Sequence, residues 1–229
     1  MKTYSVKKLY KKETFNSKTE WLNARGIGGS SASVILGLNP YKNKLQLYNE
    51  INYQGELKEN EANESMKYGV KLEPLIRKEF KLDFLNDYKV HTPKNNEMYR
   101  RIDKPYLTAT LDGILTRIED KKKGVLEIKT HDIRNYKDEE LWKNGLPYNY
   151  YIQVCHYLSV MNDFEFAVVV GRLRYINFKT NQVEKVEYVF HKISRKEREK
   201  DIETVEKLIT NFYENNIEKH IIPKVDIKF

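Results

Sequence analysis

The chain has 229 residues, of which 41 are Lys or Arg and 33 are Asp or Glu, so its formal net charge is +8. This length, with 40% apolar residues, suits a folded domain with a substantial core rather than a disordered chain. A single cysteine, Cys155, excludes an internal disulfide and a zinc site built on cysteines. No apolar run approaches the roughly 20 residues of a membrane-spanning helix, and the basic N-terminus lacks the apolar stretch of a secretory signal. We therefore expect an intracellular protein whose positive charge favours anionic partners such as nucleic acid.

The first part of the chain, up to about residue 85, carries helical patterns. Thr19 is a suitable N-cap for a short first helix. Glycines and serines within 26–33 precede the apolar Val34–Leu36, which is typical of a loop that leads into a helix. Pro74 should kink the longest helix or start a new one. The helices predicted on either side of that glycine-rich loop cover Thr19–Arg25, Leu45–Ile51 and Glu61–Leu85.

The second part of the chain alternates apolar and polar residues in the manner of β-strands. One helix, Tyr148–Met161, interrupts the strands. A long charged helix, Ser194–His220, follows them, with Ser194 and Glu197 forming a capping box. The predicted strands cover Tyr88–Thr92, Glu97–Ile102, Tyr106–Ile118, Gly124–His131, Phe164–Ile176 and Gln182–His191.

This order of elements predicts an α/β (α+β) fold with a mostly antiparallel or mixed sheet. No linker rich in Gly, Ser or Pro divides the chain, so we expect a single domain over residues 1–229. It would comprise a helical N-terminal part at about 17–85, the sheet at about 86–192 and a C-terminal helix at about 194–220.

Two carboxylates and a lysine are predicted to meet at one edge of the sheet. Glu127 and Lys129 lie two residues apart in Val125–Thr130, so their side chains share one face of a strand. A turn centred on Glu119–Asp120 would place Asp112 directly across from Glu127, although the polar run at that turn is centred slightly later. In either register the three charged side chains converge.

Such a set of side chains suits phosphodiester chemistry. Hard oxygen ligands suit Mg²⁺, with Mn²⁺ as a substitute, and a bound divalent ion polarises a phosphodiester and lowers the pKa of a water. A neighbouring lysine would orient or deprotonate that water, or neutralise charge on the phosphate. The same residues also fit an Asp-Gly turn beside a salt-bridged strand face, so the pattern alone leaves both interpretations open.

Further motifs accompany this set. Glu73 lies on the helix before the sheet, and Gln153 and Tyr157 are four residues apart, hence on one helical face. Five motifs occur in the order Gly26-Ile27-Gly28-Gly29-Ser30, Gly69…Glu73-Pro74, Asp112-Gly113, Glu127-Ile128-Lys129 and Gln153…His156-Tyr157. Together they resemble the YqaJ-like viral recombinase family, which is similar to the phage lambda exonuclease and belongs to the PD-(D/E)XK nuclease superfamily. The resemblance covers about residues 17–175 and implies a restriction-endonuclease-like core with a central mixed sheet flanked by helices.

The resemblance implies a role for each residue of these motifs. Asp112 and Glu127 would be the main metal ligands, with the Ile128 carbonyl completing the shell and Glu73 as a further acidic residue at the metal site. Lys129 would act on the attacking water.

Other residues would support this site or bind the substrate. Gln153 and Tyr157 would support the site from the adjacent helix. A terminal 5′-phosphate of DNA would be bound by four residues whose guanidinium and hydroxyl groups suit a phosphate monoester, namely Arg25, Ser30, Thr110 and Arg134.

The leading hypothesis is therefore a Mg²⁺-dependent 5′-to-3′ exonuclease that acts on double-stranded DNA ends. By resemblance it would serve phage-type recombination in the cytoplasm of a bacterial host, hand single strands to an annealing protein, and assemble as a trimer. An endonuclease with the same site, restriction-like or structure-specific, is the first alternative. A DNA-binding module with a vestigial site is the second.

Overall fold

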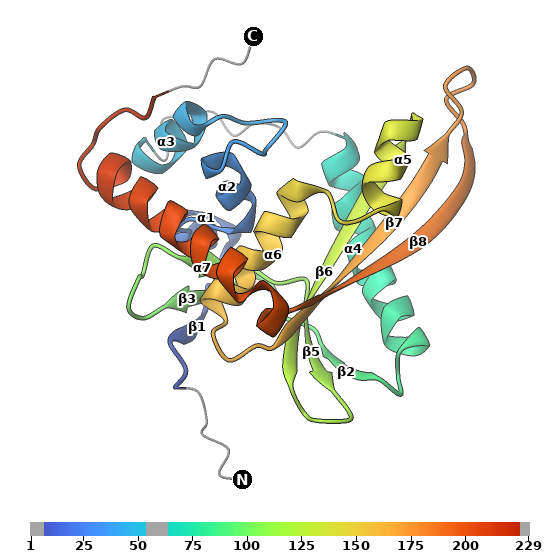
Figure 1. Cartoon of the computed structure of the whole chain (residues 1–229), viewed down its shortest axis with the longest axis horizontal. Helices are drawn as coiled ribbons and strands as arrows, with labels where there is room; N and C mark the ends of the chain where they lie inside the picture. Colours follow the sequence, from blue (N-terminus) through green and yellow to red (C-terminus); the bar gives the residue numbers. More distant parts are fainter. Residues whose placement is uncertain (1–6, 54–63, 225–229) are drawn as a thin grey trace.

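A five-stranded sheet in the order β2-β5-β6-β7-β8 forms the centre of the molecule (Figure 1). The computed structural model describes residues 7–53 and 64–224. The strands are β2 (Tyr88–His91), β5 (Gly113–Arg117), β6 (Lys123–Ile133), β7 (Phe166–Ile176) and β8 (Val183–Ser194). β6 and β7 are parallel, whereas every other neighbouring pair in this sheet is antiparallel. The predicted mixed sheet is thus confirmed.

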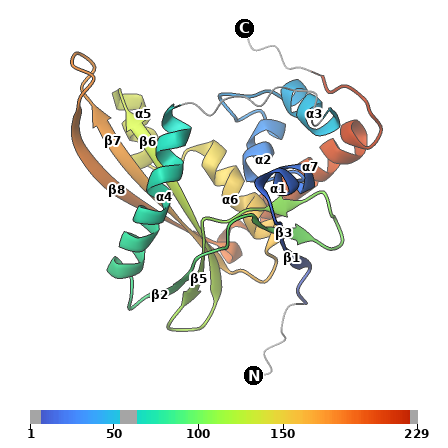
Figure 2. The same ribbon diagram turned by 180° about the vertical axis from the view of Figure 1, so that it is seen from behind.

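Helices cover both faces of this sheet. Helix α4 (Glu64–Asp83) lies against one face, and α5 (Tyr136–Lys143) and α6 (Tyr148–Val160) lie against the other (Figures 1 and 2). Successive residues of β6 serve the two faces in turn: Leu126 packs with the α4 side, and Val125 packs with the α6 side. Helix α6 is buried throughout its second half, so it forms the centre of the larger core.

A smaller sheet and the remaining helices pack on the α6 side. The smaller sheet has the order β1-β3-β4, with β1 (Tyr10–Thr14), β3 (Glu97–Arg101) and β4 (Thr108–Ala109). The helices are α1 (Lys18–Ala24), α2 (Gly29–Ile35), α3 (Lys44–Asn52) and α7 (Arg195–Phe212), which continues as a π-helical turn (Tyr213–Ile217). Among the described helices, none is long and apolar enough to cross a membrane.

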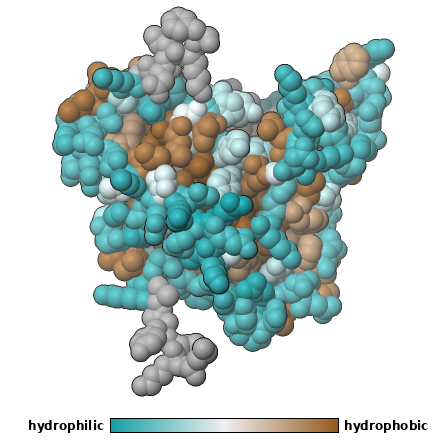
Figure 3. Space-filling model, viewed as in Figure 1, coloured by the Kyte–Doolittle hydropathy of each residue, from teal (hydrophilic) through white to brown (hydrophobic). Residues whose placement is uncertain are grey.

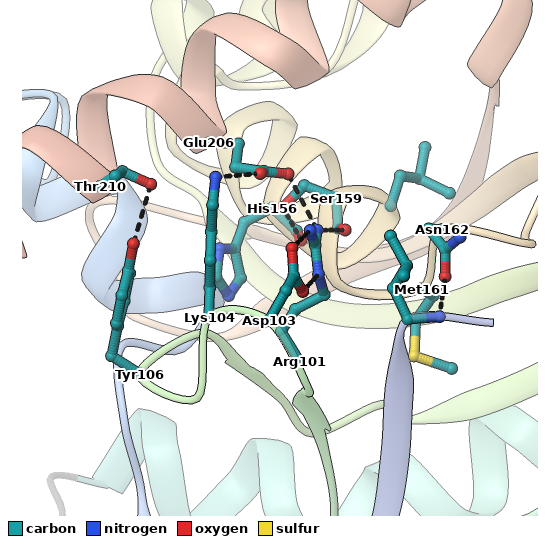
Figure 4. A network of polar contacts seen from close by, with 12 residues as sticks. Arg101, Asp103, Lys104, Tyr106, His156, Ser159, Met161, Asn162, Glu206 and Thr210 are labelled. Atoms are coloured by element: carbon teal, nitrogen blue, oxygen red, sulfur yellow. Dashed lines mark hydrogen bonds and ion pairs between the residues drawn. The ribbon is translucent and has the colours of Figure 1, made fainter. Parts of the chain in front are cut away.

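A buried arginine joins the smaller sheet to the helices (Figure 4). Arg101, at the end of β3, donates to Asp103 Oδ1 at 2.7 Å and to the Ser159 carbonyl of α6 at 2.6 Å. It also pairs with Glu206 of α7 at 3.0 Å, and Lys104 pairs with the same carboxylate at 2.6 Å. These bonds fix β3, α6 and α7 relative to one another, and hence fix the helix that carries Gln153 and Tyr157.

A cavity elsewhere on the α6 side is separate from those two side chains. Apolar side chains gather over α2 and α6 on the face seen in Figure 3. A cavity of about 490 Å³ is lined there by Leu36, Ile152 and Val205, with Arg198 and Asp201 beside them. Ile152 points away from Gln153 and Tyr157 on the helical wheel of α6.

Several predicted elements differ from the structure. Helix α4 runs through Pro74 instead of restarting there, because Pro74 lies on the exposed side, where the carbonyl that it leaves without a donor meets water. Ser17, not Thr19, caps α1, and its hydroxyl accepts from the Glu20 amide at 3.1 Å. The expected strand Tyr106–Ile118 is divided into β4 and β5, which belong to different sheets.

The C-terminal helix also differs from its prediction. Ser194 makes no side-chain capping bond, so the capping box with Glu197 is wrong, because Ser194 still belongs to β8 and pairs with Phe166. The α-helix ends at Phe212 rather than near His220. Strand β1 and helix α5 were not predicted at all.

Candidate active site

Asp112 and Glu127 lie opposite each other at the end of the β5–β6 pairing. The last pair in the register is Gly113 with Leu126, so the next residues outward are Asp112 and Glu127. This register corresponds to the turn centred on residues 119–120. Beyond the last pair, the Ile128 amide donates to Asp112 Oδ2 at 2.7 Å. The Asp112 side chain therefore occupies the place of a strand partner and is held beside the backbone of β6.

Lys129 and Gln153 hold the Glu127 carboxylate from two sides. Lys129 Nζ lies 2.6 Å from Glu127 Oε1, and Gln153 Nε2 donates to the same oxygen at 2.7 Å. Gln153 Nε2 also contacts the Tyr157 hydroxyl at 2.8 Å. The Glu127 side chain is only 2% exposed, whereas that of Lys129 is 20% exposed. The structure thus brings together the acidic pair, the lysine and both α6 residues.

Burial and mutual repulsion shift the pKa of each acid in this group. Burial, followed by the Asp112 charge, raises the pKa of Glu127 to about 8. Burial also raises the pKa of Asp112, against the opposing effect of Lys129. Burial alone would lower the pKa of Lys129, but Glu127 and Asp112 outweigh it and raise that pKa. A positive charge added beside these carboxylates would favour their ionised forms.

Glu73 approaches the same group from α4. Burial and the Asp112 charge raise the pKa of Glu73, which shows that the two carboxylates act on each other. One helical turn later, Arg77 forms an ion pair with Glu73. The Arg77 side chain is 13% exposed, and its Nε is buried without a hydrogen-bond partner among the described residues. Arg77 was not identified from the sequence.

An aromatic wall backs Lys129. Its Nζ lies 5.0 Å from the centre of the Tyr150 ring, within cation–π range. The Trp142 ring of α5 packs 5.5 Å from the Tyr150 ring and is itself fully buried. Gly171 of β7 leaves the space for Trp142, since a Cβ there would lie 2.6 Å from the indole. Tyr150 was not identified from the sequence, because its ring reaches Lys129 only when α6 packs against the sheet.

The oxygen donors of this group fit Mg²⁺. Oε2 of Glu127 is buried and has no hydrogen-bond partner in the part of the chain that the structure describes. A buried carboxylate oxygen without a partner is costly unless a positive group meets it. Within residues 7–53 and 64–224, no group of three or more His, Cys, Asp or Glu side chains is placed to hold a metal ion by itself. The donors that the acidic pair offers are carboxylate oxygens, the protein ligands that Mg²⁺ takes alongside several waters.

The glycine-rich loop lies against the α6 residues. A Cβ at Gly29 would lie 2.6 Å from Gln153 Cγ and 2.7 Å from Tyr157 Cε1, so only glycine allows this approach. Arg25 lies at the end of α1, and one guanidinium nitrogen is 3.5 Å from the place of a Cβ at Gly28. The Tyr157 hydroxyl group acts electrostatically on Arg25. The Arg25 guanidinium thus lies beside the glycine-rich loop, on the side of the acidic group where Gln153 and Tyr157 lie.

The other predicted phosphate-binding residues are divided between two regions. Ser30 is exposed at the first turn of α2, and Thr110 is partly buried two residues before Asp112. Arg134 instead contacts Asp132 at 3.6 Å and Asn181 at 3.1 Å, on the arm formed by β6 and the β7–β8 hairpin. The contacts of Arg134 therefore do not join it to Arg25.

The sequence of this chain matches a known protein family. The model of the YqaJ-like viral recombinase domain matches residues 20–163. An uncharacterised protein of Bacillus subtilis, YqaJ, is 32% identical in an alignment over 169 residues that covers 70% of this chain and 49% of that protein. The chain therefore spans about half the length of this relative.

Two solved structures share the fold. The alkaline exonuclease LHK-Exo of Laribacter hongkongensis is 18% identical, with a TM-score of 0.57 over 89% of this chain and 96% of that one. The structure of LHK-Exo in complex with dAMP is 17% identical, with a TM-score of 0.59 over the same shares of the two chains. The expected fold, a mixed sheet flanked by helices as in these exonucleases, is confirmed. With its match to the domain model over residues 20–163, this chain belongs to the YqaJ-like viral recombinase family.

Proposed function

We propose that this protein is a Mg²⁺-dependent exonuclease that degrades double-stranded DNA from its ends in the 5′-to-3′ direction. The observation that carries the proposal is the convergence of Asp112, Glu127 and Lys129, with the buried Glu127 Oε2 lacking a hydrogen-bond partner among the described residues. Membership in a viral recombinase family and the fold of an alkaline exonuclease support it. The net charge of +8 favours a polyanionic substrate.

Asp112, Glu127 and the Ile128 carbonyl would hold the cation, with Glu73 beside them. When bound, Mg²⁺, or Mn²⁺ in its place, supplies a Lewis acid that polarises the phosphate and activates a water. Hydrolysis forms a bond from the water oxygen to phosphorus and breaks the bond from phosphorus to O3′. The products are a nucleoside 5′-monophosphate and a strand with a new 5′-phosphate.

The side chains around the acidic pair would orient the reacting groups. Lys129 can donate a hydrogen bond to the water or to a phosphate oxygen from its place 2.6 Å from Glu127. Gln153 Nε2 donates to the same carboxylate oxygen, Glu127 Oε1, at 2.7 Å, and also donates to the Tyr157 hydroxyl, which holds the amide in place. This preorganisation avoids a reorganisation cost during the reaction.

A terminal 5′-phosphate would bind beside the glycine-rich loop. Arg25 offers a guanidinium suited to two hydrogen bonds with a phosphate, and Ser30 and Thr110 offer hydroxyl groups. Arg134 lies on the arm of β6 and would meet the DNA at a different phosphate or after a movement of the arm.

Digestion of end-labelled DNA tests the proposal. The substrates are linear duplexes labelled at the 5′ or the 3′ end, with a covalently closed circle beside them, each in Mg²⁺ and in EDTA. We expect rapid Mg²⁺-dependent loss of the 5′ label as mononucleotide, slow loss of the 3′ label, and intact circles. Cut circles would assign the site to an endonuclease. DNA binding without any cleavage in Mg²⁺ or Mn²⁺ would assign the protein to a non-catalytic DNA-binding module.

The wider role follows from the direction of cleavage. Resection of 5′ ends leaves a 3′ single strand, which a single-strand annealing protein would take up during phage-type recombination in a bacterial host cell. We also propose that the chain forms a homo-oligomer, a trimer by family resemblance. Light scattering coupled to size exclusion measures its mass, and a monomeric mass of 27.4 kDa would contradict the trimer.

A further inference from the structure

The side chain of Arg25 lies against an aromatic ring instead of a carboxylate. Its guanidinium carbon is 4.8 Å from the centre of the Trp21 ring. The two residues are four apart at the end of α1, the spacing that brings side chains together along a helix. Within residues 7–53 and 64–224, the guanidinium makes no hydrogen bond or ion pair with another side chain. The Trp21 ring is therefore its main direct contact.

Among the described residues, no carboxylate pairs directly with this positive charge. Burial lowers the pKa of Arg25. The charges of Tyr157 and Glu50 act in the opposite direction but do not outweigh burial. Glu50 is itself paired with Lys42 at 2.6 Å. A guanidinium stays protonated in proteins, so a desolvated positive charge remains beside the Gly28 backbone. Trp21 Nε1 is also buried without an acceptor in the described part of the chain.

The segment around Trp21 is anchored on both sides. Ser17 caps the start of α1, and the Arg25 amide closes its end by donating to the Leu22 carbonyl at 3.2 Å. Arg100 of β3 holds the Ala24 carbonyl and pairs with Glu13 of β1 at 2.8 Å. The backbone that carries the indole is therefore anchored, and the guanidinium lies against the ring without donating a side-chain hydrogen bond to any other residue that the structure describes.

We propose that Trp21 is a specificity-determining residue, whose ring holds the Arg25 guanidinium ready for a terminal phosphate and so sets the preference for phosphorylated over hydroxyl DNA ends. This inference rests on the proposed function and names a residue outside its motifs. A carboxylate partner would have to be displaced by an incoming phosphate, whereas an aromatic ring holds the cation and leaves its donors free. Trp21 acts through Arg25 and is thus a positioning residue.

The test is the ratio of the dissociation constants for two hairpin duplexes with one open end, which carry either a 5′-hydroxyl or a 5′-phosphate. Anisotropy in Ca²⁺ with EDTA-treated protein measures binding separately from cleavage. We expect wild type to prefer the phosphorylated end by roughly tenfold or more, as for a charge-assisted hydrogen bond. Arg25→Met should abolish the preference. Trp21→Leu should reduce it by about fivefold, and Trp21→Phe, which restores a ring, by less.

Matched controls separate the outcomes. Phe178→Leu removes an exposed ring that also lies against a cation, Lys179, and should leave the ratio unchanged. A wild-type ratio in Trp21→Leu, or equal losses in Trp21→Leu and Trp21→Phe, would overturn the inference, provided that thermal unfolding shows each variant folded. An unchanged ratio in Arg25→Met would overturn it as well. Failure of wild type to degrade DNA in Mg²⁺ would contradict the proposed function instead, because the binding ratio does not depend on cleavage.

Discussion

The Ile128 amide donates a 2.7 Å hydrogen bond to Oδ2 of Asp112, just beyond the last backbone pair between β5 and β6. A side chain proposed as a metal ligand therefore also completes the strand pairing. Its two roles are separable, because an amide oxygen can accept the same bond without carrying a charge.

Asp112→Asn should keep the fold, whereas Asp112→Ala should weaken it. The alanine variant leaves the Ile128 amide without its acceptor, which costs about 1–3 kcal/mol of unfolding free energy. The asparagine variant should lie within about 1 kcal/mol of wild type, since its carbonyl oxygen accepts the bond. Urea unfolding measures both values. Equal stability of the two variants would show that this bond does not support the sheet.

Tyr150 should support activity through its ring rather than its hydroxyl group. The ring lies 5.0 Å from Lys129 Nζ, so Tyr150→Phe keeps the cation–π contact and Tyr150→Leu removes it. Loss of a desolvated contact of this kind should lower kcat by roughly tenfold in the leucine variant. The phenylalanine variant should stay within about threefold of wild type. Steady-state digestion of linear DNA measures both, and a larger loss in the phenylalanine variant would point to the hydroxyl group instead.

Gly29→Ala should damage both stability and activity. Alanine normally favours a helix, but here its Cβ would lie 2.6 Å from Gln153 Cγ. The resulting shift of α2 or α6 should cost about 1–3 kcal/mol and displace the Gln153 amide from Glu127. Gly145→Ala is the control, because no atom lies within 4 Å of its added Cβ. Equal behaviour of the two variants in urea unfolding would contradict the close contact.

His156 should make the fold sensitive to acid. Its Nε2 lies 2.8 Å from the Thr108 carbonyl, so Nε2 carries the proton and Nδ1 is a buried acceptor without a partner among the described residues. Burial lowers the pKa of His156 to about 4. The unfolded chain, with a pKa of about 6.5, therefore binds the proton first, and stability falls as the pH drops from 6.5 through 4.

The variant His156→Gln isolates this effect. The neutral His156 contributes roughly 3 kcal/mol to the free energy of unfolding, and this contribution is present above pH 6.5 and lost below pH 4. The glutamine variant can still donate to the Thr108 carbonyl, and it does not titrate. The difference in urea-unfolding free energy between wild type and variant should therefore shrink or reverse in acid. A constant difference from pH 7.5 to pH 4.5 would contradict the lowered pKa.

The sequence predicts this site wherever one strand or one helix orders the residues. Alternation along β6 places Glu127 and Lys129 on one face, and the four-residue spacing of α6 aligns Gln153 with Tyr157. The Asp112 register depended on the position of one turn, which the polar run at 119–124 did not fix. The structure resolves that choice in favour of the direct pairing.

The parts that the sequence missed depend on tertiary packing. Helix α5 buries only Trp142, so it has no apolar period to reveal it. Strand β1 is a short lysine-rich segment whose partner, β3, lies far along the chain. Arg77 and Tyr150 gain their places only when α4 and α6 dock on opposite faces of the sheet. The local sequence pattern does not predict such tertiary contacts.

The most direct test of the central claim is the release of nucleotides from linear duplex DNA as Mg²⁺ is titrated, in wild type, Asp112→Asn and Glu127→Gln. We predict full activity only in wild type, abolished by EDTA and restored by Mg²⁺ or Mn²⁺. Both variants should be folded and slower by about a thousandfold, the loss expected when a catalytic metal is no longer held. Metal-independent cleavage by wild type, or near-wild-type rates in the folded Asp112→Asn variant, would contradict the account.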